Sequence, residues 1–250
     1  MCKFQLDGLD HAVRLDTCVY ECNNAAMTAN ISIPIITVDG PSGAGKGTLG
    51  RRLATELGWH FLDSGALYRV LAYAAIQQNL DFSSAEQLSN AALQLDVQFL
   101  DRSIIWAGQD VTRAIREVSC SEAASKVSAV PEVRTALLDR QRAFQQAPGL
   151  VADGRDMGTV VFPDAPLKIF LDASCEERAR RRFQQLQERG VDVSLSGLLR
   201  DLEERDRRDR QRPVAPLKPA GDALLFDTTS TDADQVYAEV LALVQERRLV

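Results

Sequence analysis

The residues with the clearest chemistry form one short segment, Gly40–Thr48, which reads Gly-Pro-Ser-Gly-Ala-Gly-Lys-Gly-Thr. Its glycines let backbone N–H groups turn toward an anion, and Lys46 can neutralise phosphate charge. An apolar run precedes the segment, and three leucines spaced four residues apart follow it on one helical face. A strand, a glycine loop and a helix in this order bind nucleotide phosphates, because the helix N-terminus adds the positive end of its dipole. The segment therefore predicts a phosphate-binding loop. The alternative is a chance glycine-rich loop, which the flanking strand and helix disfavour.

The residue after the lysine departs from the usual pattern of such loops. Gly47 occupies the position where Ser or Thr normally follows the lysine, and Thr48 comes one residue later. A hydroxyl in this region binds the magnesium ion that accompanies a nucleoside triphosphate. Thr48 is therefore a candidate metal ligand.

Two further segments place charged side chains where strands are predicted to end. Asp63–Arg69 follows one short strand, and Asp153–Asp156 follows another. Ligands of open α/β sheets bind at the carboxyl ends of the strands, and arginine grips phosphate with two parallel hydrogen bonds. Asp153 is a candidate for holding Mg²⁺ through water, with a turn or helix-capping aspartate as the equal alternative. Asp39, just before the glycine loop, is a candidate for the outer shell of the same metal.

Two later segments are rich in arginine. Residues 200–212 contain six arginines but five carboxylates, so their net charge is only +1. A surface that follows nucleic-acid phosphates needs unopposed charge. Spacings of three and four residues also fit ion pairs along a helix face, so a solvated helix is the alternative to a ligand-binding one. The second segment, Arg178–Arg182, either closes over a nucleotide as a lid or lies on a solvated helix.

Bulk composition limits the remaining functional classes. The chain has 250 residues, 45% of them hydrophobic, and a net charge of −6. That length allows one sizeable core with a small inserted subdomain, and the acidic balance argues against nucleic acid as the main partner. The sequence contains no run of 18 or more apolar residues, so we expect no membrane span and a cytoplasmic location. Two histidines and five scattered cysteines argue against nucleophilic triads and histidine-based metal sites.

The beginning of the chain lacks the organisation of the rest. Three of the five cysteines lie in the first 26 residues, which show no periodicity leading into the first strand. Met27 stands just before the organised chain begins. We therefore expect residues 1–27 to be a disordered extension or the product of a misassigned start, and residues 28–250 to form the folded domain.

Short apolar strands that alternate with amphipathic patterns predict a parallel α/β sheet with helices on both faces. Strands are expected at 33–38, 59–62, 150–153, 167–172 and 224–227. Helices are expected from the glycine loop to Gly58, from 63, from Ser84, and over 131–148, 174–190, 194–211 and 233–247. Residues 95–111 alternate apolar and polar around a turn, which is typical of a β-hairpin, here within an insert over about 80–115.

Four motifs, in order along the chain, resemble one family. They are GPSGAGKGT from residue 40, LDSGALYR from residue 62, DGRDMGTVVFPDA from residue 153 and RDRRDRQRPVAPL from residue 205. The Lys-Gly-Thr ending of the first is similar to that of the nucleoside monophosphate kinases, and the whole set closely resembles the bacterial cytidylate kinases. The resemblance covers about 28–250. It implies a P-loop three-layer sandwich with a five-stranded parallel sheet, a small antiparallel hairpin insert and a short helical lid.

The same resemblance implies a division of the domain and a reaction. A core over 33–79, 116–175 and 212–250 would carry a monophosphate-binding insert over about 80–115 and a lid over about 176–200. The chain would be a monomer that transfers a phosphoryl group from ATP, with Mg²⁺, to CMP or dCMP in pyrimidine metabolism. It would bind neither nucleic acid nor a membrane.

The resemblance also implies roles for individual residues. The ATP phosphates would be bound by Gly40, Pro41, Ser42, Gly43, Ala44, Gly45, Lys46, Gly47 and Thr48. The cytosine, the pentose and the acceptor phosphate would be bound by Ser64, Arg69, Arg134, Arg155, Asp156, Arg205, Asp209 and Arg212. Lys46, Arg155 and the lid residue Arg181 would stabilise the transferring phosphoryl group. Cytosine offers an amine donor and a ring-nitrogen acceptor, so Asp156 and Ser64 are the expected base readers.

Two other functions stay open. One is a small P-loop kinase that acts on another monophosphate or on a metabolite such as shikimate; the arginine set and the hairpin insert favour a nucleotide acceptor instead. The other is a nucleotide-switched regulatory or RNA-associated protein. The acidic balance of the chain and the near-neutral charge of residues 200–212 disfavour it.

Overall fold

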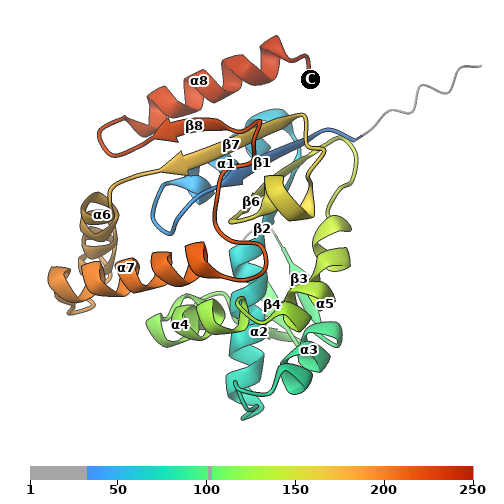
Figure 1. Cartoon of the computed structure of the whole chain (residues 1–250), viewed down its shortest axis with the longest axis vertical. Coiled ribbons are helices and arrows are strands. Elements are labelled where there is room, and N and C mark those ends of the chain that lie inside the picture. The colour runs from blue at the N-terminus through green and yellow to red at the C-terminus, as the bar shows by residue number, and fades with distance from the viewer. Residues whose placement is uncertain (1–32, 101–102, 250) are drawn as a thin grey trace, which may run out of the picture. The chain divides into compact units, whose positions relative to one another are not determined.

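The computed structural model describes residues 33–100 and 103–249. Its centre is a five-stranded parallel sheet in the order β2-β6-β1-β7-β8 (Figure 1). The strands are β1 (Ile35–Asp39), β2 (His60–Asp63), β6 (Leu150–Gly154), β7 (Leu167–Asp172) and β8 (Leu224–Asp227). The predicted five-stranded parallel sheet is confirmed, with strand ends within two residues of those expected. The extension predicted over residues 1–27 lies outside the described residues.

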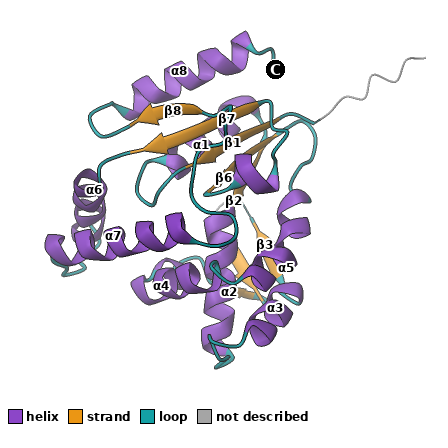
Figure 2. Ribbon diagram, in the orientation of Figure 1, coloured by secondary structure: helices purple, strands orange, loops and turns teal. Residues whose placement is uncertain are grey.

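Helices cover both faces of this sheet (Figure 2). On one face, α1 (Lys46–Leu57) and α8 (Ala233–Glu246) bury their apolar sides against Ile36, Val38 and Ile169. The opposite face of β1, β2 and β6 packs against the helical turn that follows β6. Because both faces are covered, the strands read as nearly continuous apolar runs, as the sequence shows.

The remaining helices match the predicted pattern with two differences. They are α2 (Ser64–Gln77), α3 (Ala85–Leu93), α4 (Val118–Val127), α5 (Pro131–Arg142), α6 (Cys175–Gln187) and α7 (Leu195–Gln211), with a 3₁₀ turn at Ala114–Arg116 and a π-helical turn at Met157–Val161. Two expected helix boundaries are confirmed by their caps: Ser84 accepts from the N–H of Gln87, and Gly58 ends α1 in the left-handed region with φ 64°. The predicted helix from 131 ends six residues early, and α4 was not predicted from the sequence.

The predicted hairpin is part of a three-stranded antiparallel sheet. Its strands are β3 (Val97–Phe99), β4 (Ile104–Trp106) and β5 (Gln109–Asp110). The first two strands carry the apolar alternation on which the prediction rested. β5 consists of two exposed polar residues, so it has no periodicity that a sequence reading could detect.

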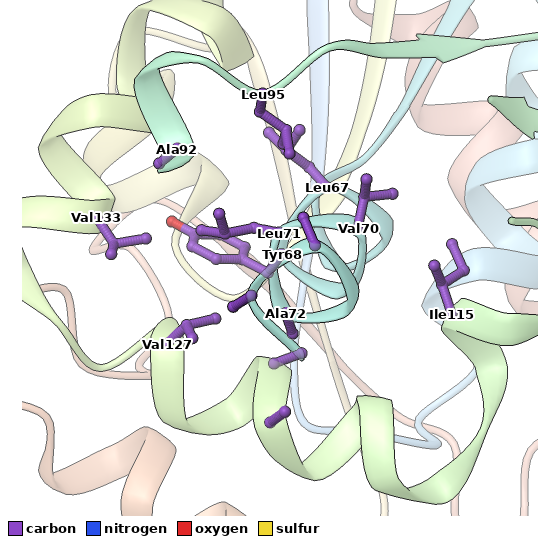
Figure 3. Packing of buried hydrophobic residues seen from close by; sticks show 14 of the residues in the cluster. Leu67, Tyr68, Val70, Leu71, Ala72, Ala92, Leu95, Ile115, Val127 and Val133 are labelled. Atoms are coloured by element: carbon purple, nitrogen blue, oxygen red, sulfur yellow. The ribbon is translucent and has the colours of Figure 1, made fainter. Parts of the chain in front are cut away.

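A second apolar core surrounds α2, the helix that follows β2. Leu67 and Leu71 are fully buried there, and Figure 3 shows Tyr68 and Leu71 among side chains that include Val127 of α4 and Val133 of α5. The helix starts where Asp63 accepts from the N–H of the third residue along. This packing fixes the orientation of the polar residues in the first two turns of α2.

The register of the sheet brings the predicted chemistry together. Val38 lies beside Asp153, and Asp39 lies beside Gly154; Asp63 is also paired with Asp153. The glycine loop, the start of α2 and the segment after β6 therefore all leave the sheet at the carboxyl ends of its strands. Within the described ranges, no helix is both long and apolar enough to cross a membrane.

Candidate active site

The carboxyl ends of β1, β2 and β6 lead into a cavity lined mainly by polar and charged side chains. Most of the predicted site residues line it: Ser42, Gly43, Lys46, Ser64, Arg69, Arg134, Asp153, Arg155, Asp156, Arg205, Asp209 and Arg212. These residues come from the glycine loop, α2, α5, the end of β6 and α7. The fold thus gathers widely separated parts of the sequence around one space.

The glycine loop presents backbone groups rather than side chains. Gly43 and Gly45 have φ values of 85° and 94°, in the region that disfavours residues with a Cβ. Gly45 precedes the first residue of α1, and no side chain caps that helix. The first N–H groups of a helix have no partner within the helix, so the loop offers them, together with the positive end of the dipole, to an anion.

Lys46 is the buried cation of this loop. Its Nζ donates to the carbonyl of Pro41 at 2.8 Å, and the residue is only 5% exposed. Burial, and then repulsion by Arg155, lowers the pKa of Lys46 to about 7, while Asp153 and Asp39 act in the opposite direction. The ammonium therefore stands in a site that lacks enough negative charge to hold it protonated at alkaline pH.

The lack of a side chain at Gly47 leaves space for the carboxylate of Asp153. A Cβ at this position would lie 3.3 Å from Oδ2 of Asp153, tighter than ordinary van der Waals contact. Burial raises the pKa of Asp153 to about 6, although Lys46 lowers it. Thr48, the other candidate metal ligand, is exposed and does not line the cavity.

The far side of the cavity is held by a buried ion pair between Arg134 and Asp156. Arg134 also donates to the carbonyl of Ser128 at 3.1 Å. Ser64 is buried beside this pair and donates from Oγ to the carbonyl of Asp153 at 2.8 Å. These contacts fix the orientation of Asp156 and Ser64, the two side chains that were predicted to read the cytosine, and of Arg134.

A second group of charges comes from α7 and the end of β6. Nε of Arg155 donates to Oδ2 of Asp209 at 3.1 Å. Although burial raises the pKa of Asp209, Arg155, Arg205 and Arg212 hold it below its usual range. Burial and repulsion from Arg155 lower the pKa of Arg205 to about 10. Within the described part of the chain, the buried Nε atoms of Arg205, Arg212 and Arg69 have no hydrogen-bond partner.

Arg178, which the sequence left as either a lid residue or a solvated one, has neither position. It is 2% exposed, and it donates to both carboxylate oxygens of Asp206 at 3.2 and 2.5 Å. It also donates to the carbonyls of Ala173 and of Ser42 in the glycine loop, at 2.9 and 3.0 Å. A single buried guanidinium therefore connects the glycine loop, the end of β7 and α7. Sequence reasoning missed the partner carboxylate.

Arg181 lies on the same helix but is not brought to the cavity. Its Nε donates to Glu177 at 2.8 Å, and its terminal nitrogens donate to the hydroxyl and the carbonyl of Thr228. The hydroxyl of Thr228 in turn donates to the carbonyl of Ala44 in the glycine loop at 3.1 Å. The structure thus connects Arg181 to the glycine loop through Thr228, and leaves it outside the cavity.

Asp39 does not line the cavity either. Its two carboxylate oxygens accept hydrogen bonds from the backbone N–H groups of Met157 and Gly158, each at 2.8 Å. The outer-shell metal role suggested from its place in the sequence finds no support in these contacts. The carboxylate holds the turn after β6 instead.

Sequence reasoning also missed Tyr68 and Ser128, which line the cavity. Tyr68 comes one helical turn after Ser64, so it shares a face of α2 with it, and that spacing is a signal that could have found it. Ser128 follows α4, whose sequence pattern did not predict a helix.

Comparison with known proteins places the chain among relatives of one family. The family model described as Cytidylate kinase matches residues 36–246. A cytidylate kinase from Klebsiella pneumoniae is 56% identical over 90% of this chain and 100% of its own length, and one from Stutzerimonas stutzeri is 58% identical over 87% and 97%. Among solved structures, a shikimate kinase from Acinetobacter baumannii in complex with shikimate covers 88% of this chain and 97% of its own, at 19% identity and a TM-score of 0.41.

Proposed function

Since this chain belongs to the cytidylate kinase family, we propose that it transfers the γ-phosphoryl group of ATP to CMP or dCMP and yields ADP and CDP or dCDP. The observation that carries the proposal is the cavity. There the glycine loop, with its buried lysine and the uncapped start of α1, faces buried arginines and aspartates. Such a space suits two phosphorylated ligands that meet end to end.

The donor side fits the phosphates of ATP. Gly40 to Thr48 would bind them mainly through backbone N–H groups at the start of α1. Lys46 would leave the carbonyl of Pro41 for a phosphate oxygen, and an anion beside it would restore its protonated form. We assign to Lys46 the stabilisation of charge on the transferring phosphoryl group.

The site also fits Mg²⁺ that arrives with the triphosphate. Asp153 is the carboxylate next to Gly47 and Lys46, and Mg²⁺ typically takes one or two carboxylates, substrate phosphates and water. When bound, the ion would neutralise phosphate charge and align the β- and γ-phosphates. We propose that Asp153 binds the Mg²⁺ through a water molecule. Because Thr48 is exposed, we place it only at the periphery of the metal site.

The acceptor side suits cytosine. Because the hydroxyl of Ser64 already donates to the backbone carbonyl of Asp153, its oxygen is available to accept from the exocyclic amine of the base. Asp156 would accept from the same amine, and Arg134 would donate to the ring nitrogen or carbonyl. A uracil would leave these buried acceptors unpaired, which is the arrangement that rejects a wrong ligand strongly.

The remaining charges suit the pentose and the phosphate of the acceptor. Asp209, oriented by Arg155, would accept from a pentose hydroxyl. Arg69, Arg205 and Arg212 have buried donor atoms without partners in the described residues, and we assign them to the acceptor phosphate. The charge of Arg155 lowers the pKa of both Lys46 and Arg205, and we assign to Arg155 a contact with the transferring group.

The reaction needs no dedicated general base. The acceptor phosphate is already anionic at pH 7, so in-line attack on the γ-phosphorus requires alignment and charge neutralisation. The bond between the acceptor phosphate oxygen and the γ-phosphorus forms as the bond from the γ-phosphorus to ADP breaks. The side chains named above would keep the attacking and leaving oxygens in line. A lid over about 176–200 would exclude water. For Arg181 to take part, it would have to leave Glu177 and Thr228.

The domain division follows as part of the proposal. We propose that the core over 33–79, 116–175 and 212–250 carries an insert over about 80–115 that helps to bind the monophosphate. We further propose that the protein acts in the cytoplasm as a monomer, with ATP and the acceptor nucleotide as its partners and no nucleic acid or membrane. The net charge of −6 supports the exclusion of nucleic acid.

A substrate panel tests the proposal. ADP release is coupled to an indicator reaction, with CMP, dCMP, UMP, AMP, GMP and shikimate as acceptors. We expect the largest kcat/KM for CMP or dCMP. A preference for AMP, GMP or shikimate would overturn the assignment of acceptor, and turnover that none of the acceptors accelerates would favour a nucleotide-switched binding protein.

A further inference from the structure

One buried carboxylate lies between the two sides of the site and contacts neither ligand space. Asp39 is the last residue of β1, directly before the glycine loop, and it is 5% exposed. Its oxygens accept from Met157 and Gly158, which immediately follow Asp156. By position in the sequence Asp39 belongs to the donor side, whereas by its hydrogen bonds it belongs to the acceptor side.

The turn that Asp39 holds has the kind of geometry that needs an outside acceptor. Asp156 has φ −149° and ψ 23°, and a π-helical turn starts at Met157. The first N–H groups of such a turn have no internal partner, and Asp39 accepts from two of them. The turn also has little free space, because a Cβ at Gly158 would lie 2.8 Å from Oγ1 of Thr37.

Retaining a charged group here is costly, which shows how much the contacts matter. Burial raises the pKa of Asp39 to about 7, although both backbone hydrogen bonds lower it. Asp156 raises the same pKa and Lys46 lowers it. A neutral amide would avoid the desolvation cost, but it could accept only one of the two hydrogen bonds and would turn N–H donors toward the other.

From this geometry we propose that Asp39 is a positioning residue for the acceptor base: it fixes the turn that presents Asp156 to cytosine, and it does not act on ATP or its metal. The inference rests on the proposed function, since it concerns base recognition by that same site. It predicts that a change next to the donor loop alters the choice of acceptor while donor binding is unaffected.

The test uses Asp39→Asn in the full-length chain and compares steady-state kinetics with the unmodified protein. We expect KM for CMP to rise about tenfold and the CMP-over-UMP ratio of kcat/KM to fall about tenfold, the size of effect that a lost buried hydrogen bond produces. KM for ATP and the Mg²⁺ concentration for half-maximal rate should stay within about twofold, because the contacts of Asp39 lie on the acceptor side.

Thr37→Val is the matched control. Thr37 is fully buried on the same strand, its hydroxyl has no partner in the described structure, and the two side chains have similar shapes. We expect this variant to keep the CMP-over-UMP ratio. If Asp39→Asn does not fold, as judged by circular dichroism, Asp39→Ser carries the same test, because serine keeps one acceptor and removes the buried charge.

Two results would overturn the inference. One is an unchanged CMP-over-UMP ratio in a folded variant; the other is a rise of KM for ATP or of the Mg²⁺ requirement with CMP unaffected. Both are distinct from failure of the proposed function, which would show as an unmodified protein that does not phosphorylate CMP at all.

Discussion

The glycine loop and the proposed acceptor side of the cavity would bind phosphate groups by different means. The loop is nine consecutive residues that offer backbone N–H groups and one lysine. The proposed acceptor side would use side chains from α2, α5, the end of β6 and α7, several of which are held by an ion pair or a buried hydrogen bond. A triphosphate can be bound by backbone alone, because its charge has no fine directional pattern. Choosing a base requires donors and acceptors in fixed orientations, and those depend on long-range packing.

One contact joins the two sides. Arg178 donates to Ser42 in the loop and to Asp206 on α7, and α7 also carries two of the proposed acceptor-binding residues, Arg205 and Asp209. A change in this ion pair should therefore affect the binding of both ATP and CMP. A change within one side should affect only the ligand bound on that side.

The largest effect is expected for Asp206→Ala, which leaves a buried guanidinium unpaired. The free energy of unfolding should fall by about 3–5 kcal/mol, as is typical when one partner of a buried ion pair is removed. Urea denaturation measures it. The exposed Asp201→Ala on the same helix serves as the control and should change stability little. At a temperature where Asp206→Ala is folded, KM for both ATP and CMP should rise; an effect on only one of them would contradict the joining role.

Lys46→Met affects the donor side alone. Removing the cation that stabilises the transferring phosphoryl group should lower kcat by about 10²–10³-fold, with the fold retained because the methionine fills the same buried space. The coupled ADP assay and circular dichroism check both points. A folded variant with nearly unchanged kcat would show that Lys46 does not act in the reaction.

Asp156→Asn affects the acceptor side alone. The side chain keeps its size but loses charge opposite Arg134 and gains donors that favour uracil. We expect the CMP-over-UMP ratio of kcat/KM to fall about tenfold or more, with KM for ATP unaltered. Competition between the two acceptors in one reaction gives the ratio directly, and an unaltered ratio would remove Asp156 from base reading.

The smallest expected effect is a change in the protonation of Lys46 when ATP binds. Because the pKa of Lys46 is lowered to about 7, most molecules hold it neutral at pH 8, and bound phosphates should raise the pKa again. Binding of a non-hydrolysable ATP analogue at pH 8 should therefore take up a fraction of a proton. Calorimetry in buffers of different ionisation enthalpy measures it. Lys46→Met should abolish the uptake; proton release by the unmodified protein would contradict the sign.

The same contrast explains what could be predicted from the sequence. The glycine loop is contiguous, so its residues, spacing and flanking elements carry the whole signal. Arg134 and Asp156 were predicted as substrate-binding residues through the family resemblance, but their ion pair was not predicted, since nothing local links residues so far apart. Asp206 was missed because a helix with mixed charge does not show which aspartate is buried. α4 was missed because its alanines and serines give little amphipathic contrast, and the role of Asp39 depends on backbone donors across the sheet.

The place of β1 in the sheet affects how the protein is made. Its residue Ile35 pairs with Leu150, and Ile36 pairs with Leu167, so both neighbours of the central strand are synthesised more than a hundred residues later. At a ribosomal rate of about 5–20 residues per second, the apolar strand that precedes the glycine loop waits for several seconds without partners. A nascent chain at that stage carries a complete phosphate-loop sequence on an unpaired strand. We therefore expect the nascent chain to depend on chaperones at this stage, and to form no acceptor site until α7 has left the ribosome.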